Sequence, residues 1–406
     1  MTTHILIVGS GISGITAARL LAEQGHKVTL IDQRAHIGGN CYDHWDKNGI
    51  CVHDYGTHIF HTDNKAIWTF LSRFTQWYPY QHKVSGLIEG QLVPIPFNLN
   101  SIHQVFPAKL AERLEDKLLE QFGYAVKVPI LKLRETDDVD LKFLADYIYQ
   151  HIFSFYTQKQ WDLNPEALDP VVTGRVPVYI SKDNRYFQNR YQGIPLNGYT
   201  ALFENMLDHP NITVKLNTRY DAIKALINRK EKDGKVSKDS IKADVILYSG
   251  PIDEYYDYVL GELPYRSERF EFIEINRQYF QSGAVINYPN NYTFTRIGEY
   301  KYFLDTESDK TVVSYEYPEP FIRGKNERYY PIINESNQAL YRQYQVKAEQ
   351  DRSTLKKSIP THQPRNAEVG SVAVPVYFFG RLGDYQYYDM DKAIERAFAL
   401  VKEITA

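Results

Sequence analysis

The chain has 406 residues, enough for one large hydrophobic core or two to three smaller ones. Its 47 Lys and Arg against 50 Asp and Glu give a formal net charge of −3, which excludes the overall basicity that draws a protein to nucleic acid or to an anionic membrane. Cys41 and Cys51 make no disulfide framework and fit no zinc spacing, and no stretch approaches the roughly 20 apolar residues of a membrane span, so we expect a cytoplasmic protein without a metal.

The beginning of the chain predicts a β-α-β unit. His4–Val8 is a short apolar strand, Ser13–Gln24 has helical periodicity, and Lys27–Ile31 is a second strand that ends at Asp32. A carboxylate at the end of the second strand can accept hydrogen bonds from the ribose of a bound adenosine. The unit therefore predicts a Rossmann-like nucleotide-binding fold.

A Gly-x-Gly-x-x-Gly motif, Gly9–Gly14, joins the first strand to the helix. Its glycines allow a tight turn, a close approach of a pyrophosphate and the packing of helix on strand, and the phosphates bind at the helix N-terminus. A second glycine turn, Arg34–Asn40, follows the unit and is typical of FAD proteins. The predicted FAD contacts at this end are Gly9, Gly11, Ile12, Ser13, Gly14, Asp32, Gln33, Gly39 and Asn40.

Helical periodicity continues through the middle of the chain and then gives way to strands. Asp63–Phe74, Ile102–Phe122 and Leu141–Tyr156 are expected to be helical, so that a largely helical block is predicted between about residues 63 and 160. Short strands are predicted at Val176–Ile180, Ile212–Leu216 and Asp244–Tyr248. Aromatic and β-branched segments at Arg269–Tyr288, Tyr292–Ile297 and Thr311–Tyr317 predict an antiparallel sheet, and Ser336–Glu349 is expected to be helical.

The last segments predict the other end of the cofactor site. Val376–Phe379 is a final strand, followed by Gly380-Arg381-Leu382-Gly383 and by a helix that opens at Asp389 and Met390. Arg381 can neutralise the FAD diphosphate, and a helix N-terminus can stabilise negative charge on reduced flavin. The fold class is thus α/β, with a discontinuous Rossmann-like FAD-binding domain (1–62, 199–262, 370–406), an inserted helical substrate domain (63–165) and an antiparallel β-sheet domain with a mobile loop (166–198, 263–369).

Several strings occur in the order found in one enzyme family, and together they resemble the bacterial UDP-galactopyranose mutases from about residue 4 to about residue 400. Besides the glycine motif they are His36–Asn40, Tyr55–Thr62, Tyr156–Trp161, Gly193–Pro195, Gly198–Thr200, Thr295–Ile297, Tyr329–Pro331 and Gly380–Leu382.

The resemblance implies an isomerase (an intramolecular transferase) that interconverts UDP-galactopyranose and UDP-galactofuranose without net redox change. In this family FAD is active when reduced, and its N5 attacks the anomeric carbon of the sugar. The resemblance also implies a homodimer and an electron donor such as NAD(P)H or a flavin reductase.

The site residues carried over by resemblance fall into three groups. Arg175 and Arg296 are expected to bind the diphosphate and stabilise departing UDP, with His61 beside the flavin as the third catalytic residue, and His58 and Ile59 as FAD contacts. Arg175 lies in the loop that closes over substrate in the family, and Gly174 and the turn Asp183-Asn184 are expected to give it flexibility. The substrate contacts are His82, Ile152, Phe153, Tyr156, Thr157, Trp161, Arg175, Tyr186, Asn287, Arg296, Tyr330 and Tyr387.

Two departures from the family pattern and two other functions stay open. Phe155 replaces a glycine found in some relatives, and His82 stands where some have asparagine, so a 2-acetamido UDP-sugar is also a possible substrate. One alternative function is an FAD-dependent oxidase of the amine-oxidase type, which needs an apolar cage for an amine. The other is a non-catalytic protein that binds FAD or a UDP-sugar.

Overall fold

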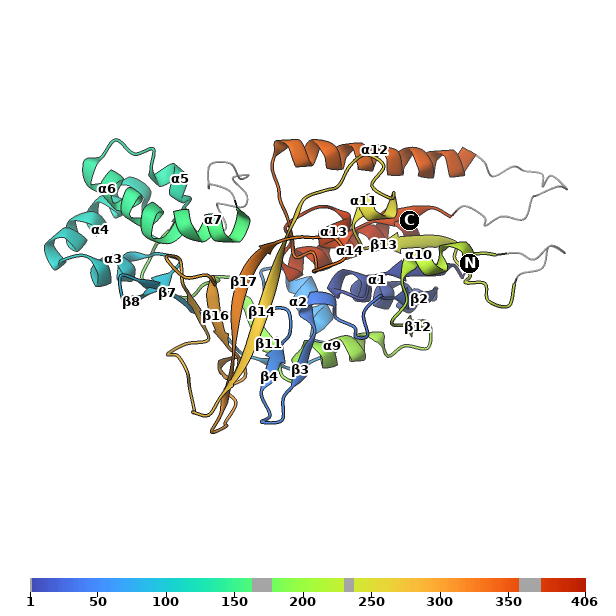
Figure 1. Ribbon diagram of the computed structural model, residues 1–406, viewed down its shortest axis with the longest axis horizontal. Helices are drawn as coiled ribbons and strands as arrows, with labels where there is room; N and C mark the ends of the chain where they lie inside the picture. The colour runs from blue at the N-terminus through green and yellow to red at the C-terminus, as the bar shows by residue number, and fades with distance from the viewer. Residues whose placement is uncertain (1, 163–176, 230–236, 358–373) are drawn as a thin grey trace.

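The computed structural model describes residues 2–162, 177–229, 237–357 and 374–406. Figure 1 shows a group of helices at one end of the molecule, a parallel sheet with its helices at the other, and the long strands of a second sheet between them. The fold thus has three structural regions, with the second sheet between the other two.

The parallel sheet takes its strands from the start, the middle and the end of the chain, as the sequence predicts. Its five strands are all parallel and stand in the order β12 (Ile212–Lys215), β2 (Lys27–Ile31), β1 (His4–Val8), β13 (Val245–Tyr248) and β19 (Val376–Phe378). This arrangement confirms the Rossmann-like α/β fold class.

Alternation along β1 divides the buried residues between the two faces of this sheet. Ile5 and Ile7 pack in the core under α1 (Ile12–Glu23), α9 (Gly198–Leu207) and α14 (Met390–Thr405). Leu6 points to the opposite face, where it packs in the core beneath α11 (Ile252–Tyr255) and α12 (Glu335–Lys357). Both faces of the parallel sheet are therefore covered.

The second sheet has seven strands and is antiparallel except at one pair. Its order is β18 (Tyr330–Pro331), β14 (Tyr265–Ile275), β17 (Thr311–Pro320), β16 (Arg296–Glu299), β15 (Val285–Asn287), β7 (Val84–Ile88) and β8 (Gln91–Ile95). The parallel pair is β15 with β7. The β7–β8 hairpin was not predicted, because it lies inside the block that periodicity marks as largely helical.

The helical region differs from the prediction at two breaks. The predicted helix Ile102–Phe122 is two helices, α3 (Leu99–Val105) and α4 (Ala108–Phe122), because Pro107 cannot continue the first one. The predicted helix Leu141–Tyr156 is divided into α6 (Val139–Ile148), the π-helix η2 (Tyr149–Ser154) and α7 (Phe155–Trp161). A π-helical turn changes the direction in which the following side chains point, and α7 carries several predicted site residues.

The remaining elements are short. Three strands form a small sheet in the order β5 (Phe60–Thr62), β11 (Tyr191–Pro195) and β6 (Trp77–Tyr78). Two further antiparallel pairs are β3 (Asp43–Trp45) with β4 (Cys51–His53), and β9 (Val126–Val128) with β10 (Val178–Ile180). The short helices are η1 (Gly39–Cys41), α2 (Lys65–Leu71), α5 (Ile130–Leu133), α10 (Tyr220–Ile223), η4 (Lys224–Leu226), η5 (Tyr300–Phe303) and α13 (Gly380–Gly383).

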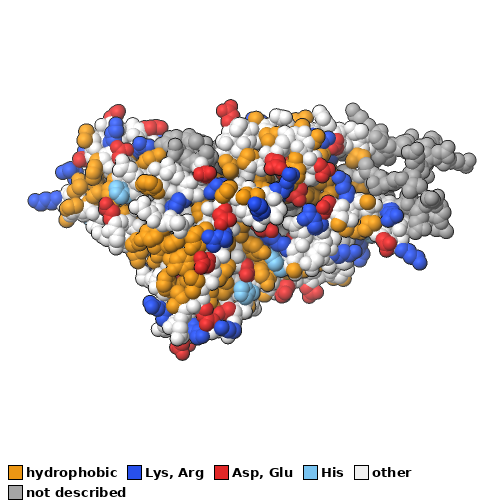
Figure 2. All heavy atoms as spheres, viewed as in Figure 1, with side chains coloured by type: hydrophobic (Ala, Val, Ile, Leu, Met, Phe, Trp, Pro, Cys, Tyr) orange, Lys and Arg blue, Asp and Glu red, His pale blue; other side chains and the backbone are white. Residues whose placement is uncertain are grey.

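The surface is mixed in character. Figure 2 shows apolar side chains gathered over the seven-stranded sheet, whereas charged side chains are spread over the rest of this face. Of the helices in the described ranges, none combines the length and the apolar composition that a membrane crossing needs.

Candidate active site

The glycine motif at the end of β1 is packed as a nucleotide-binding turn requires. Gly9 has a φ of +100°, and its amide donates to the Ile31 carbonyl at 2.8 Å, so the turn is tied to β2. A Cβ added at Gly14 would lie 2.0 Å from the Gly9 carbonyl oxygen, a backbone atom that cannot move aside. Gly14 therefore lets α1 pack directly against the turn.

The second glycine turn lies against the first. The Gly38 amide donates to the Ser10 carbonyl at 2.8 Å, and a Cβ on Gly39 would lie 3.0 Å from Gly11 Cα. A Cβ added at Gly11 meets no protein atom within 4 Å, and α1 begins there without a side-chain cap. Open space in front of uncapped amides fits a dinucleotide diphosphate.

Asp32 has a structural task that the sequence did not reveal. Its carboxylate accepts hydrogen bonds from the Ser10 amide and hydroxyl, both at 2.7 Å, and from the Arg34 amide at 2.9 Å. It thereby holds the two glycine turns together. A carboxylate has about four lone-pair positions, so this does not prevent it from also accepting from a ribose. Gln33 is exposed, and the Asn40 side chain accepts from Arg34.

The C-terminal segment that contains Gly380 and α14 packs against the start of α1. Gly380 has a φ of +81°, and a Cβ there would lie 3.2 Å from Ser13 Oγ on α1. The Ser13 hydroxyl donates to the Ala393 carbonyl in the first turns of α14, which begins at the predicted Met390 after Asp389. The structure thus brings together the two predicted ends of the cofactor site.

Arg381 stands between this region and a cluster of aromatic residues. Its guanidinium donates to the Tyr388 carbonyl at 2.7 Å and lies 5.4 Å and 5.8 Å from the ring centres of Tyr330 and Tyr387. No carboxylate forms an ion pair with it among the residues that the structure describes. Such a cation is suited to an anionic ligand.

One face of the seven-stranded sheet collects polar residues through strand register. Asn287, Arg296 and Glu316 are direct partners across β15, β16 and β17, so their side chains share a face. Glu316 also pairs with Phe270 on β14, which puts Glu268, two residues away, on that face. Tyr330 pairs with Arg266 and joins it as well. Two predicted substrate contacts, Asn287 and Tyr330, therefore lie on the same surface as the predicted catalytic Arg296.

Arg296 lies between two buried carboxyl groups. Its Nε is 2.8 Å from Glu316 Oε2, and Glu316 and Glu268 are 1% and 8% exposed. Burial raises the pKa of Glu268, and it raises the pKa of Glu316 to about 8 against the pull of the guanidinium. Burial disfavours the Arg296 cation, but the two carboxyl groups and the phenols of Tyr156 and Tyr330 keep its pKa above the ordinary value. The arginine remains charged, and the acid pair retains a proton more readily than free glutamate does.

Aromatic side chains cover this charged group. Trp161, the last residue of α7, lies 6.0 Å and 5.7 Å from the ring centres of Tyr330 and Tyr387. Burial raises the pKa of Tyr156 and of Tyr330, so both phenols keep their protons and can donate hydrogen bonds. The predicted residues Tyr156, Trp161, Tyr330 and Tyr387, which come from three separate parts of the sequence, therefore come together around Arg296 and Arg381.

His61 is held in one orientation by a loop. Its ring stacks on Phe187 with 3.6 Å between ring centres, and its Nδ1 is 3.0 Å from Asn189 Oδ1. The Asn189 amide nitrogen donates to Asp63 at 2.8 Å, so the Asn189 oxygen must face His61, and Nδ1 carries the proton.

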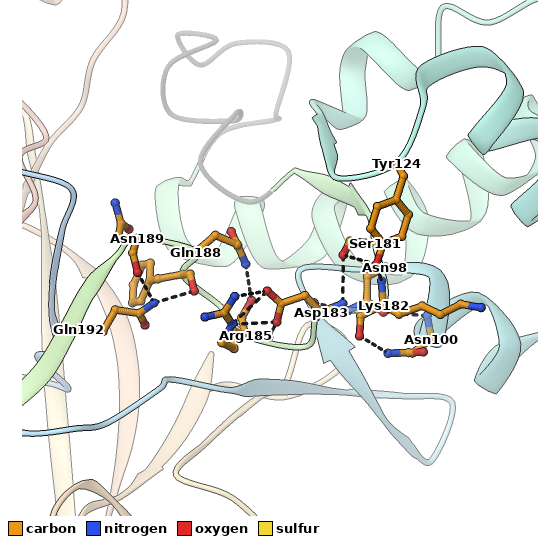
Figure 3. Close-up of polar contacts among 11 residues, drawn as sticks. Asn98, Asn100, Tyr124, Ser181, Lys182, Asp183, Arg185, Gln188, Asn189 and Gln192 are labelled. Atoms are coloured by element: carbon orange, nitrogen blue, oxygen red, sulfur yellow. Dashed lines mark hydrogen bonds and ion pairs between the residues drawn. The ribbon is translucent and has the colours of Figure 1, made fainter.

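The loop that carries Asn189 is also fixed farther back, as Figure 3 shows. Arg185 forms a two-pronged ion pair with Asp183, at 3.0 Å and 2.7 Å. The Asn98 side chain donates to Asn184 at 3.0 Å. Asn100 donates to the Lys182 carbonyl. Hydrogen bonds therefore hold residues on both sides of the Asp183-Asn184 turn in this conformation, and the flexibility expected of the loop stays a prediction.

His82 lies between the predicted sugar site and the core. It is 4% exposed, its Nδ1 is 3.2 Å from the Tyr80 hydroxyl, and its carbonyl accepts from the Tyr186 amide at 2.7 Å. Burial, assisted by the nearby Arg296, lowers the pKa of His82 to about 3, so the ring is neutral. The structure thus brings together His82, Tyr186 and Arg296, three residues predicted to contact the substrate.

The other predicted residues are less directly connected to this cluster. Ile152 and Phe153 lie in η2 and are 8% exposed in the core of the helical region, and Thr157 is buried in α7. His58 donates from Nδ1 to the Gly56 carbonyl at 2.8 Å, and Ile59 is buried. Burial lowers the pKa of His58 to about 3. Arg175 and Gly174 lie outside the described residues.

One cluster has the composition of a metal site but is explained by hydrogen bonding. Ligand atoms of Asp43, Cys51 and His53 lie within 4.8 Å of one another. The Asp43 carboxylate, however, accepts from the amides of Tyr199 and Thr200 and so caps α9. Burial raises the pKa of Cys51, which remains a thiol and donates to Asp43.

Sequence reasoning missed Glu268 and Glu316, and it gave no role to Lys159 although the string Tyr156–Trp161 was noted. The available signal was a charged residue inside a strand that is otherwise aromatic and β-branched. Such a residue must find a partner on the neighbouring strand or lie at a site.

The sequence of this chain is similar to family models and to known proteins. A family model described as UDP-galactopyranose mutase matches residues 151–357, and one described as NAD(P)-binding Rossmann-like domain matches residues 7–74. The dTDP-fucopyranose mutase of Escherichia coli is 35% identical over 396 residues, which cover 97% of this chain and 96% of that protein. A probable UDP-galactopyranose mutase of Klebsiella pneumoniae is 35% identical over 404 residues, covering 98% and 94%.

Solved structures agree at the level of the fold. The crystal structure of a reduced UDP-galactopyranose mutase superposes with a TM-score of 0.68 at 16% identity, covering 100% of this chain and 96% of that one. L-amino-acid oxidases also match, but either over a small part of the chain or at 20% identity. The mutases are therefore the better supported relatives.

Proposed function

This chain belongs to the UDP-galactopyranose mutase family, and from that premise we propose that it interconverts UDP-galactopyranose and UDP-galactofuranose with the help of bound FAD. The reaction is an isomerisation without net oxidation or reduction.

The observation that carries the proposal is the meeting of cations and phenols from separate parts of the chain. Arg296, Arg381, Tyr156 and Tyr330 interact electrostatically within one buried region, and Trp161 lies beside it. A nucleotide diphosphate needs fixed positive charge, hydroxyl donors and an aromatic surface for its base. An amine, the substrate of the alternative oxidase, would be repelled by the two guanidiniums.

The residues at the two glycine turns fit FAD. Gly11 leaves open space before the uncapped start of α1, where the diphosphate would bind, and Arg381 would supply a countercharge. When bound and reduced, FAD supplies a nucleophilic nitrogen, N5, for the anomeric carbon of the sugar. We extend the proposal, on family resemblance, to NAD(P)H or a flavin reductase as electron donor, to a homodimer and to a cytoplasmic location.

The protein's own groups have separate tasks in this proposal. Arg296 binds the diphosphate and stabilises the charge of UDP as it departs, together with Arg175. Tyr186, Tyr330 and Tyr387 donate to phosphate oxygens. Tyr156 and Trp161 lie at the uridine end, where Trp161 offers its ring to uracil. His61, whose ring is held by Phe187 and Asn189, lies beside the flavin and helps to tune it.

The test compares two redox states of one preparation. Dithionite-reduced protein is expected to convert UDP-galactofuranose to UDP-galactopyranose, as followed by chromatography, whereas oxidised protein is not. Equal conversion in both states would exclude a role for reduced flavin. Because one relative is named for dTDP-fucopyranose, that sugar nucleotide is assayed beside UDP-galactopyranose, and hydrogen peroxide is measured to detect an oxidase.

A further inference from the structure

Helix α7 is attached to the face of the seven-stranded sheet that carries the site. The Gln160 side chain donates to Glu268 at 2.7 Å, and Arg266 donates to the carbonyls of Gln160 and Lys159 at 2.9 Å and 3.2 Å. These contacts fix the end of α7 over β14. They leave open what aligns α7 with Arg296, which lies two strands away on β16.

Lys159 makes that second connection. Its Nζ lies within 3.2 Å of four backbone carbonyl oxygens, those of Tyr288, Asn290, Tyr292 and Phe294. All four belong to the turn between β15 and β16. The ammonium of an α7 residue is therefore surrounded by the turn of another region, 129 to 135 positions away in sequence.

The turn joins two residues of the site. It leaves β15 at Asn287 and enters β16 at Arg296, and these two are direct partners in the sheet. The Tyr288 amide donates to the Thr295 carbonyl at 2.8 Å, which closes the turn at its base. Carbonyl dipoles that point at one centre repel one another, so a cation at that centre stabilises this conformation of the turn.

We propose that Lys159 is a positioning residue that fixes the distance between the base-binding helix α7 and the diphosphate-binding Arg296. The inference rests on the proposed function, because it assigns both ends of one nucleotide to these two elements. It deepens that function by naming a residue that touches neither substrate nor flavin. Precise spacing matters because a misplacement of about 1 Å can cost about a hundredfold in rate.

Burial disfavours the charged form of the Lys159 ammonium. Burial lowers the pKa of Lys159 to about 8, whereas the four carbonyls favour the protonated state. A lysine that served only to cover the surface would keep its charge in water.

The chain offers a matched control at the other end of strand β16. Lys301 is 1% exposed and donates to the carbonyls of Gln278 and Ser308, so it too is enclosed by backbone oxygens. It lies in η5, directly after β16, whereas the turn that Lys159 contacts comes directly before β16. Loss of Lys301 should therefore affect stability without affecting the spacing of the nucleotide site.

The experiment measures UDP affinity by calorimetry in flavin-bound protein, for wild type, Lys159→Met, Lys159→Arg and Lys301→Met. We expect Lys159→Met to weaken UDP binding by at least about tenfold and to raise KM more than it lowers kcat, with Lys301→Met within about twofold of wild type. The Lys159→Arg protein keeps the positive charge and should bind UDP more tightly than the Lys159→Met protein does. Amide hydrogen exchange of residues 288–294 should accelerate in ligand-free Lys159→Met and not in Lys301→Met.

The outcomes separate the two levels of the proposal. If wild-type protein binds neither UDP nor dTDP, the proposed function fails. If wild type binds UDP and Lys159→Met binds it within twofold, or if Lys301→Met weakens it equally, the positioning role of Lys159 is wrong. Unchanged hydrogen exchange in the turn would also overturn it.

Discussion

The two ends of the site are built in different ways. The cofactor end uses backbone: Gly9, Gly11 and Gly14 act by lacking a side chain, and the atoms that would contact a phosphate are amides at the start of α1. The nucleotide-sugar end uses side chains: Arg296, Glu316, Glu268 and Tyr330 come from four strands and are aligned by register.

This difference explains why one end can be recognised in a short stretch of sequence and the other cannot. A backbone site needs a few residues in a fixed order, so the requirement is written within six positions. A side-chain site needs groups on one face of a sheet, and a shift of one residue in any strand would turn its group to the other face. The second end therefore depends on the whole tertiary fold.

The largest effect is expected where backbone atoms leave no room. A Cβ at Gly14 would lie 2.0 Å from the Gly9 carbonyl oxygen, so Gly14→Ala must separate α1 from its turn. Purified Gly14→Ala should contain almost no flavin, measured by absorbance near 450 nm, and should melt at a lower temperature. Gly11→Ala is the matched control: it meets no protein atom within 4 Å, so its apoprotein should melt like wild type while flavin is lost. A flavin-replete Gly14→Ala would show that the turn is not a backbone site.

A smaller but still large effect is expected at the side-chain end. Arg296→Ala should keep its flavin, because the change is remote from the glycine turns, but should lose about a hundredfold or more in kcat/KM. Truncation also leaves the buried Glu316 without its cation, so the melting temperature should fall. Steady-state kinetics and flavin absorbance on the same preparation test both statements. Loss of flavin together with activity would mean that the two ends are not independent.

The smallest effect concerns pH. The pKa of Glu316 is raised from 4.5 to about 8 in the folded chain, so between these values the native state holds a proton that the unfolded state has released. This contribution to stability is present below pH 4.5 and is lost as the pH rises toward 8. Between pH 5 and pH 8 the melting temperature of wild type should therefore fall by on the order of a few degrees more than that of Glu316→Gln. Parallel curves for the two proteins would contradict the buried proton.

Much of the fold could be predicted from the sequence, because its signals are local. The β1–α1–β2 unit, β13 and β19 follow from short apolar runs bounded by glycine and proline. The break at Pro107 could have been read from the proline itself. The β7–β8 hairpin could not, since its residues pair with β15, about 200 positions later, and its own pattern is short.

The site could be predicted only as far as motifs reach. The glycines, Arg381 and the Tyr156–Trp161 string were visible, but the task of Asp32 in holding Ser10 was not. Glu268 and Glu316 became meaningful only with the strand register. The roles of Arg175 and its loop stay predictions, because they lie outside the described residues.

The order of the strands in the parallel sheet has a consequence for synthesis. Its last strand, β19, is added at the edge next to β13, and α14, which packs on α1, follows it. A nascent chain can pair β1 with β2 before α14 is made, yet the helix layer over these strands stays incomplete until α14 has left the ribosome. The glycine motif is thus translated more than 370 positions before the helix that encloses it.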